Sequence, residues 1–312
     1  MIHAEKLIDK PIFIMSLDLE LLWGFVLHPG DRGAISLKND KKRGRDAINF
    51  LLDLFKKYRI PATWAIVGHL FLDHYEGEDI ITKNLPQFRE KQNLCISFSK
   101  IDEDLYCSTD IIEKIMSSPI EHDIGYHSFS HVPFSECSRN IAESEIRKGI
   151  KLAKKFGISL RSFVFPYDKI RYVDLLKENK FWIYRGKIHN RANMKQNIFF
   201  RRINWIIDKI AVRPVSPVWN DGIWEIPSSM CFYDPIVPYN ILSRAKRGIR
   251  QSITNGENKV FHMYIHPHNL LSDASLRRKL DEIFRFVSKK KRMGQIDVMT
   301  MQELASYLNM NG

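Results

Sequence analysis

The stretch Asp123-Ile124-Gly125-Tyr126-His127-Ser128-Phe129-Ser130-His131 carries two histidines four residues apart. Residues 120–126 are predicted to form a strand that ends at these histidines. On a helix that begins here, both imidazoles would point the same way and could close on one divalent cation. Many pairs at this spacing are only neighbours on a solvated helix face. The stretch is therefore a candidate metal site that needs further ligands from elsewhere in the chain.

The composition is that of a packed globular protein, since 44% of the 312 residues are hydrophobic and 12% are aromatic. The length fits one α/β barrel-sized domain or two smaller ones. A formal net charge of +12 indicates anionic partners, and nucleic acid, an anionic lipid surface and a phosphorylated substrate are all compatible with it. The basic residues cluster at 41–45, 244–250 and 289–292, although solvated loops and helix faces have the same composition.

The cysteines and the start of the chain indicate the compartment. Cys95, Cys107, Cys137 and Cys231 show no CxxC spacing, which is typical of reduced thiols in a cytoplasmic protein. Residues 1–10 are charged and lack the apolar core of a signal peptide, and no window approaches the roughly 20 apolar residues of a membrane span. We expect a soluble cytoplasmic protein, or one peripheral to the inner membrane face.

The first strand is predicted to deliver two carboxylates. Residues 11–17 form an apolar run that ends in Asp18-Leu19-Glu20, the pattern of a buried strand. Asp18 and Glu20 are two residues apart, so on an extended strand both side chains face the same side. Two acids on one buried face are costly unless a cation or a reaction uses them. The alternative is an exposed strand end followed by a helix N-cap.

Strands and helices then alternate along the chain, which predicts βαβ units. The clearest helices are residues 47–58 and 141–156, and the clearest strands are residues 62–68, 161–168 and 259–268. Residues 73–110 and 186–222 have no clear pattern and are predicted to be irregular insertions in a single domain that spans 1–312. The chemically informative residues fall at predicted strand ends, and in a barrel of alternating strands and helices these ends meet at one mouth. They are Asp18, Glu20, His127, His131, Pro166, Tyr167, Trp224, Glu225 and His266.

With these motifs in this order, the chain resembles the polysaccharide deacetylase family, also called the NodB-homology or carbohydrate esterase 4 family. The resemblance covers about residues 11–304 and rests on Ser16-Leu17-Asp18-Leu19-Glu20, His127-Ser128-Phe129-Ser130-His131, Phe165-Pro166-Tyr167, Trp224 and Ile265-His266-Pro267. It implies the α/β class and, within it, a distorted (β/α) barrel of about seven parallel strands.

The resemblance also implies a role for each site residue. One divalent metal, expected to be zinc, would be held by Glu20, His127 and His131. Asp18 would stand at the position of the general base and His266 at that of the general acid. The substrate carbonyl oxygen would be held by the metal and by the backbone N–H of Tyr167.

Four further residues are predicted to contact substrate. Trp23 follows the acids and could stack on a sugar ring, although a core tryptophan has the same pattern. Pro166 fixes the turn beside the site, and Trp224 matches the tryptophan of the fourth family motif. His268 is either a substrate contact or a partner of the catalytic groups, and the alternative is an exposed loop histidine. His262 is predicted to be a packed strand residue.

The chain departs from the family pattern at three places. Leu19 separates the two acids, which leaves open which acid binds the metal. Val164 stands where the third motif has an arginine, and Arg161 or Arg171 could substitute for it. The fourth motif keeps Trp224, but its acids lie at altered spacing.

These features predict a metal-dependent hydrolase that removes an N-acyl group, acetyl or formyl, from an amino sugar. The expected substrate is a sugar nucleotide or a lipid-linked glycan in surface polysaccharide or lipopolysaccharide synthesis, and the basic surface suits contact with a pyrophosphate or an anionic membrane. The alternative is a catalytically inactive glycan-binding or assembly protein on the same fold, which Val164 and the non-adjacent acids favour. Only net charge suggests a nucleic-acid binder, so none is expected as a partner.

Overall fold

The fold is built on one sheet whose strands alternate with helices. In the computed structural model, the residues described are 7–25, 32–74, 104–188, 212–233, 240–254, 259–271 and 273–311. The strands are β1 (Ile12–Leu19), β2 (Thr63–Ile66), β3 (Asp123–Tyr126), β4 (Ser162–Val164), β5 (Ile183–Ile188), β6 (Val218–Asn220), β7 (Ile223–Ser228), β8 (Met230–Cys231), β9 (Val260–Ile265) and β10 (Asp297–Met299). The helices are α1 (Arg32–Asn39), α2 (Lys41–Tyr58), α5 (Thr109–Met116), α6 (Arg139–Lys155), α7 (Val173–Glu178), α9 (Ile241–Thr254), α10 (Ala274–Arg292) and α11 (Met301–Asn311).

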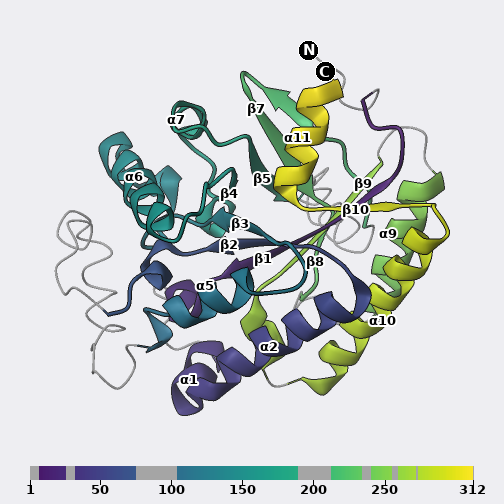
Figure 1. The fold of residues 1–312 in the computed structure, drawn as a ribbon, viewed down its shortest axis with the longest axis horizontal. Helices are drawn as coiled ribbons and strands as arrows, with labels where there is room; N and C mark the ends of the chain where they lie inside the picture. The colour runs from purple at the N-terminus through teal and green to yellow at the C-terminus, as the bar shows by residue number, and fades with distance from the viewer. Residues whose placement is uncertain are drawn as a thin grey trace, which may run out of the picture.

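The sheet curls into a distorted barrel, as predicted. Its order is β6-β7-β5-β4-β3-β2-β1-β9-β8, with β10 also paired to β1, and every pair is parallel except β6 with β7. β7 pairs with β5, whereas β8, which follows after Ser229 alone, pairs with β9. Consecutive segments of chain therefore hold both ends of the curled sheet (Figure 1).

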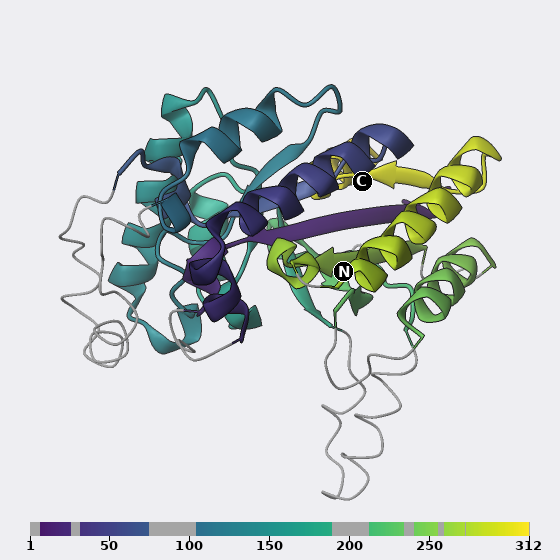
Figure 2. The ribbon, with the colours of Figure 1, turned by 90° about the horizontal axis from the view of Figure 1, so that it is seen from below.

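β1 is buried along its whole length, and its two faces do different work. Phe13, Met15 and Leu17 point outward and pack with α2 and α10, which run alongside β1 in Figure 2. The alternate residues, from Ile12 to Asp18, point into the barrel, because side chains along a strand alternate between faces. The inward row is apolar at its start and polar at its end, so β1 carries polar groups toward the carboxyl end of the barrel.

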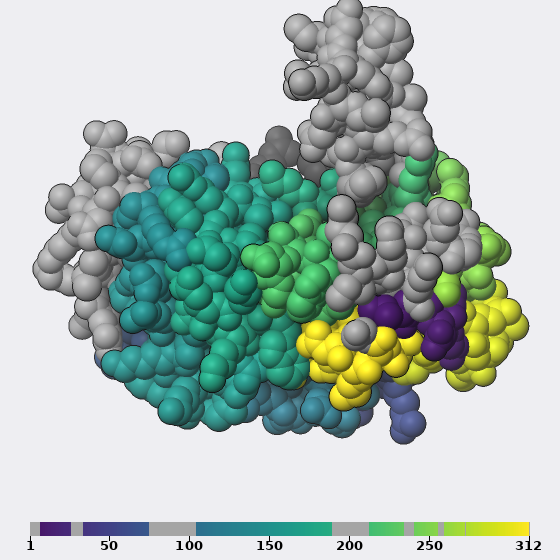
Figure 3. Space-filling view, turned by 90° about the horizontal axis from the view of Figure 1, so that it is seen from above, coloured from purple at the N-terminus to yellow at the C-terminus, as the bar shows by residue number. Residues whose placement is uncertain are grey.

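The opposite end of the barrel is closed by α11. Met301, Leu304 and Leu308 of this helix share a core with residues at the starts of β1, β5, β7 and β9, among them Ile12, Ile183, Trp224 and Val260. α11 lies beside the first described residues of the chain (Figure 3), where Tyr307 Oη accepts a hydrogen bond from the Asp9 backbone. This apolar layer fills the barrel at the starts of the strands, away from the polar residues at their ends.

The irregular insertions predicted at 73–110 and 186–222 lie largely outside the described residues. Their described parts contain regular structure that the sequence did not indicate, since β5 continues to Ile188 and β6 forms a hairpin with β7. Cys107, Cys137 and Cys231 are free thiols, and Cys95 lies outside the described residues. Within the described ranges, the helices are all too short or too polar to cross a bilayer.

Candidate active site

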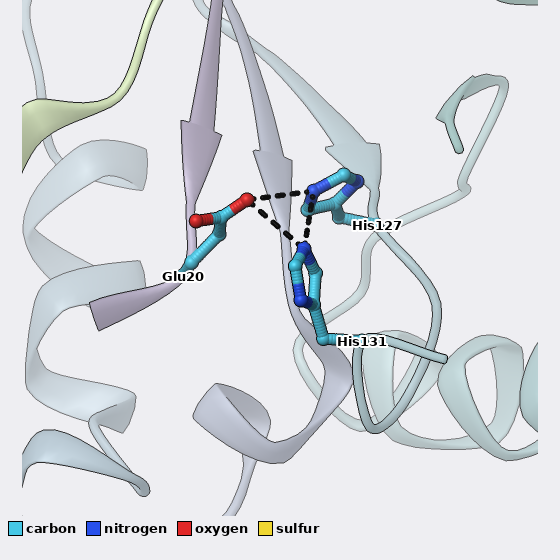
Figure 4. A group of neighbouring side chains, drawn as sticks. All are labelled: Glu20, His127 and His131. Atoms are coloured by element: carbon cyan, nitrogen blue, oxygen red, sulfur yellow. Dashed lines mark hydrogen bonds and ion pairs between the residues drawn. The ribbon is translucent and has the colours of Figure 1, made fainter. Parts of the chain in front are cut away.

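Three side chains from two strand ends converge on one point at the carboxyl end of the sheet (Figure 4). Glu20 follows β1, and His127 and His131 follow β3. Glu20 Oε1 lies 3.0 Å from the Nε2 atom of each histidine, and the two Nε2 atoms lie 3.2 Å apart. All three side chains are at least 95% buried. The structure therefore brings together the three residues predicted to bind the metal.

The protonation of His127 shows that this cluster suits a cation. His127 Nδ1 lies 2.8 Å from the Val164 carbonyl oxygen, which can only accept a hydrogen bond, so Nδ1 carries the proton. In the neutral imidazole, Nε2 then presents a lone pair to the Glu20 carboxylate. Ligands that share one zinc ion at about 2.1 Å lie roughly 3.4 Å apart in a tetrahedral site, close to the spacing observed. The residues present therefore fit a divalent metal.

The electrostatics of the cluster agree with this geometry. Burial raises the pKa of Glu20, but the neighbouring His131 and His266 lower it more, so its pKa lies well below the usual range. Burial lowers the pKa of His131, although Glu20 partly opposes this shift. Glu20 is consequently a carboxylate at neutral pH and His131 favours the neutral form, which are the states that ligate metals.

The turn after β1 explains how Glu20 reaches the histidines despite the intervening Leu19. Leu21 has a left-handed backbone with φ of 47°, and the short helix η2 (Leu21–Phe25) starts there. A side chain on Gly24 would overlap the Glu20 carboxylate, so the glycine gives the acid its place. Asp18, within β1, and Glu20, just after it, therefore both face the site but contact different partners.

The histidines do not lie on a helix, which corrects one sequence prediction. Residues 127–131 form a loop in which Ser128 and His131 both have φ of 58°, in the left-handed region. The imidazoles meet because the loop folds back on itself, not because successive helical turns align them. The spacing of four residues correctly indicated that the two imidazoles meet, but the backbone that brings them together is a loop and not a helix.

Asp18 forms a paired salt bridge with Arg185, a residue that the sequence analysis missed. Arg185 Nη1 lies 2.5 Å from Asp18 Oδ1, and Nη2 lies 2.6 Å from Oδ2. Both side chains are almost fully buried. Burial raises the pKa of Asp18, but the charges of Arg185, His266 and His127 and the hydrogen bonds from Arg185 together lower it further, so the carboxyl stays ionised at neutral pH.

Several barrel-interior groups hold Arg185. Its guanidinium lies over the Tyr264 ring at 4.1 Å and donates to Ser16 Oγ at 3.4 Å. Ser16 Oγ in turn lies 2.8 Å from Nε2 of His262, which is fully buried and whose pKa burial lowers to about 3. His262 is therefore a neutral packed strand residue, as predicted. One sequence signal could have revealed Arg185: a charged residue within the apolar strand run that begins at Phe181.

The two arginines proposed as substitutes for the missing motif arginine lie elsewhere. Arg161 donates to the Lys180 carbonyl and covers the Trp182 ring, and Arg171 donates to the Ser135 carbonyl. Val164 is buried in the apolar layer inside the barrel. Arg185, from the next strand of the sheet, takes the place that the sequence left empty.

His266 completes the polar cluster. Its Nε2 atom lies 3.5 Å from Asp18 Oδ2 and 3.6 Å from Glu20 Oε1. Burial lowers the pKa of His266, but Glu20 and the neighbouring Cys231 side chain raise it more, to about 10. A protonated imidazole therefore faces both carboxylates at neutral pH.

Tyr167, Pro166 and His268 border this cluster. The Tyr167 ring lies 4.6 Å from that of His131, and its backbone has φ of 55° in the turn that Pro166 begins. The His268 ring lies 5.1 Å from that of His266 and 4.7 Å from Phe25. Tyr167 and His268 therefore lie beside the cluster, and Pro166 begins the turn that carries Tyr167 there.

Two tryptophans predicted to bind substrate are core residues. Trp23 is 1% exposed, its ring is stacked on His69 at 4.1 Å, and its Nε1 donates to the Tyr106 carbonyl. Trp224 is 2% exposed and lies at the start of β7, where its Nε1 donates to Asn309 of α11. The expectation that Trp224 lies at a strand's carboxyl end was wrong, because Trp224 is the second residue of β7.

Fold and site together define a class of protein: a curled, mostly parallel α/β barrel with a carboxylate and histidine cluster at its carboxyl end. Residues 29–181 match the sequence family described as polysaccharide deacetylase. This match confirms the resemblance to that family seen in the motifs. The matched range includes His127 and His131, whereas Asp18, Glu20, Arg185 and His266 lie outside it.

Solved structures show the same fold. A candidate polysaccharide deacetylase from Mycobacterium smegmatis is similar with a TM-score of 0.60 and 12% identity, over 96% of this chain and 90% of that chain. A 4-alpha-glucanotransferase from Thermococcus litoralis is similar with a TM-score of 0.57 and 14% identity, over 96% of this chain and 40% of that chain. No curated protein sequence matches this chain.

Proposed function

We propose that this protein is a metal-dependent hydrolase that removes an N-acyl group, acetyl or formyl, from an amino sugar. The observation that carries the proposal is the convergence of Glu20, His127 and His131 within 3.2 Å of one another, with His127 Nδ1 turned away to the Val164 carbonyl. The polysaccharide deacetylase family supports the reaction class.

Glu20, His127 and His131 would hold one divalent metal, for which zinc is the first candidate. When bound, such an ion acidifies water and polarises a carbonyl oxygen. Asp18 and His266 lie next to these three residues but are not proposed as ligands. Asp18 is paired with Arg185, and His266 is protonated. This arrangement supports Glu20 as the proposed ligand and leaves Asp18 for proton transfer.

In the proposed reaction, Asp18 accepts a proton from the attacking water, and Arg185 keeps it ionised and oriented. His266 faces the same space with its proton and donates it to the departing amine. The backbone N–H of Tyr167 is proposed to hold the acyl oxygen as negative charge develops there. Pro166 and His268 would contact the sugar at the edge of the site.

Two features of the sequence favoured the alternative of an inactive glycan-binding protein: the separated acids and the missing motif arginine. The separated acids each have a partner suited to a distinct role, because the turn after Leu19 carries Glu20 to the histidines. The missing motif arginine is replaced by Arg185. Both departures in sequence are thus compensated in space.

The substrate and its location are also proposals. With a net charge of +12, the protein suits a sugar nucleotide or a lipid-linked glycan precursor in the cytoplasm or at the inner membrane face. In the basic helix α9, Arg247 and Arg250 are exposed whereas Arg244 is buried. Neutralising Arg247 and Arg250 should therefore weaken binding of phosphorylated substrate or anionic vesicles, and unchanged binding would remove this part of the proposal.

Metal content tests the central proposal. Wild-type protein incubated with zinc should retain about one divalent ion per chain on elemental analysis, and His127→Ala should retain almost none. The exposed His74→Ala is the matched control and should bind metal as the wild type does. Acetate and formate release from amino-sugar donors should follow metal content. A wild type that stays metal-free with zinc, cobalt and manganese would overturn the proposal.

A further inference from the structure

The loop that carries both histidines rests on one buried carboxylate, Glu145 of α6, which is fully buried. Glu145 Oε2 accepts hydrogen bonds from the backbone N–H groups of Phe129 and Ser130, each at 2.8 Å. Its other oxygen accepts from Ser130 Oγ at 2.9 Å. Three donors of the segment between His127 and His131 therefore converge on a single side chain.

This segment needs such support because its backbone is strained at both ends. Ser128 and His131 each have φ of 58°, a conformation that residues with a Cβ atom rarely adopt. Strained residues persist only where the surrounding structure holds them. The hydrogen bonds to Glu145 fall on the two residues that lie between the strained positions.

Two glycines let the supporting elements approach closely. A side chain on Gly149, one turn after Glu145, would overlap the Tyr126 ring, so this glycine allows α6 to press against the end of β3. On the other side, a Cβ atom on Gly68 would lie 2.7 Å from the Phe129 ring. The backbone N–H of Gly68 also donates to the Ser128 carbonyl at 2.8 Å. The loop is thus gripped between α6 and the turn after β2.

We propose that Glu145 is a positioning residue that sets the spacing of His127 and His131 and thereby the affinity of the site for its metal. The inference rests on the proposed function. Its hydrogen bonds fall on Phe129 and Ser130, between the two histidines, so Glu145 acts through the loop that carries them. Its carboxyl group offers two acceptor oxygens on one side chain, which lets it take all three donors of the loop.

The test compares zinc affinity, measured by competition with a chromophoric chelator, across variants at position 145. Glu145→Met keeps the volume but removes every acceptor, and the affinity should fall roughly 10- to 100-fold, the usual effect of disturbing the partners of metal ligands. Glu145→Gln keeps one oxygen for the two N–H groups and should recover most of the affinity. Glu143→Met is the matched control, because Glu143 is on the same helix but pairs with Arg147 at the surface.

Circular dichroism and thermal unfolding of the metal-free proteins separate positioning from simple stability. If Glu145→Met does not fold, Ser130→Ala removes one of the three bonds and should weaken zinc binding by about threefold with the fold intact. Folded Glu145→Met with wild-type affinity, or a Gln variant no better than Met, would overturn the inference. A wild type that binds no zinc would instead contradict the proposed function, on which the inference depends.

Discussion

Asp18 and Asp123 are both buried carboxylates on strands of the same sheet, but they lie at opposite ends of it. Asp18, near the carboxyl end of β1, is 2% exposed and faces the guanidinium of Arg185. Asp123, at the start of β3, is 5% exposed and has only uncharged donors. These are Thr63 Oγ1 at 2.9 Å, Ser162 Oγ at 2.6 Å and the backbone N–H of Gln302 at 3.2 Å.

The different partners give the two carboxyls opposite pKa shifts. Burial raises both values, but at Asp18 the positive charge of Arg185, together with the neighbouring His266 and His127, lowers the pKa below its usual range. At Asp123 the hydroxyl hydrogen bonds offset burial only in part, and the pKa rises to about 6. A charged partner keeps the buried Asp18 ionised and able to accept a proton. Asp123, with neutral donors, instead connects neighbouring strands through its hydrogen bonds to Thr63 of β2 and Ser162 of β4. Burial of an acid alone therefore does not identify a catalytic residue in this barrel.

The largest effect is expected from Arg185→Met. Removing the guanidinium breaks the buried ion pair of Asp18, which typically costs about 3–5 kcal/mol of unfolding free energy. The activity should fall by roughly 10²- to 10⁴-fold, the range that a general base contributes. Denaturant unfolding at neutral pH and turnover of an N-acyl amino sugar measure the two effects.

Arg161→Met is the matched control for this prediction. Arg161 contacts the Lys180 carbonyl and the Trp182 ring at the surface, far from Asp18, so its loss should change activity by less than about twofold. Equal losses in the two variants would show that the Asp18 and Arg185 pair has no special role.

Asp123→Asn should affect stability without affecting turnover. The pKa of Asp123 is higher in the folded protein, about 6, than its ordinary value of 3.8, so the folded state binds this proton more tightly. The stabilisation is fully present below about pH 4 and is lost as the pH rises through 6, by roughly 3 kcal/mol for a shift of about two units. The advantage of wild type over Asp123→Asn should therefore shrink by up to that amount between pH 4 and 7.

Urea unfolding across this pH range measures the difference. Asp110→Asn serves as control, because Asp110 is an exposed carboxylate paired with Arg45 and should not reproduce the trend. A stability gap between wild type and Asp123→Asn that widens with rising pH would have the wrong sign and would reject the assignment.

The smallest effect is expected from Trp224→Phe at the same end of the barrel. The change removes the hydrogen bond from Trp224 Nε1 to Asn309 and should lower the unfolding free energy by about 1 kcal/mol. KM for the sugar should not change, because the ring is covered by α11 and by Trp219. Asn309→Ala should reproduce the stability loss, whereas a raised KM in Trp224→Phe alone would restore its role in substrate binding.

Local patterns predicted much of this molecule. The apolar run before Asp18 is β1, and the histidine pair follows β3 as expected. The errors came where a residue's neighbours are distant in sequence. The sequence around Trp23 and Trp224 would be the same if their rings stacked on a sugar. Only the packing of His69 on Trp23 and of α11 on Trp224 shows that they are core residues.

By itself, the sequence determined the class of fold and the kinds of residue at the site, because strand and helix periodicity and the order of motifs are local properties of the chain. The tertiary structure alone decided that Glu20 meets the histidines and that Arg185 meets Asp18. Asp18 and Arg185 are 167 residues apart in the sequence. Their contact depends on the order of β1 and β5 in the sheet, on its curl, and on which face each side chain takes, and no local pattern encodes that combination.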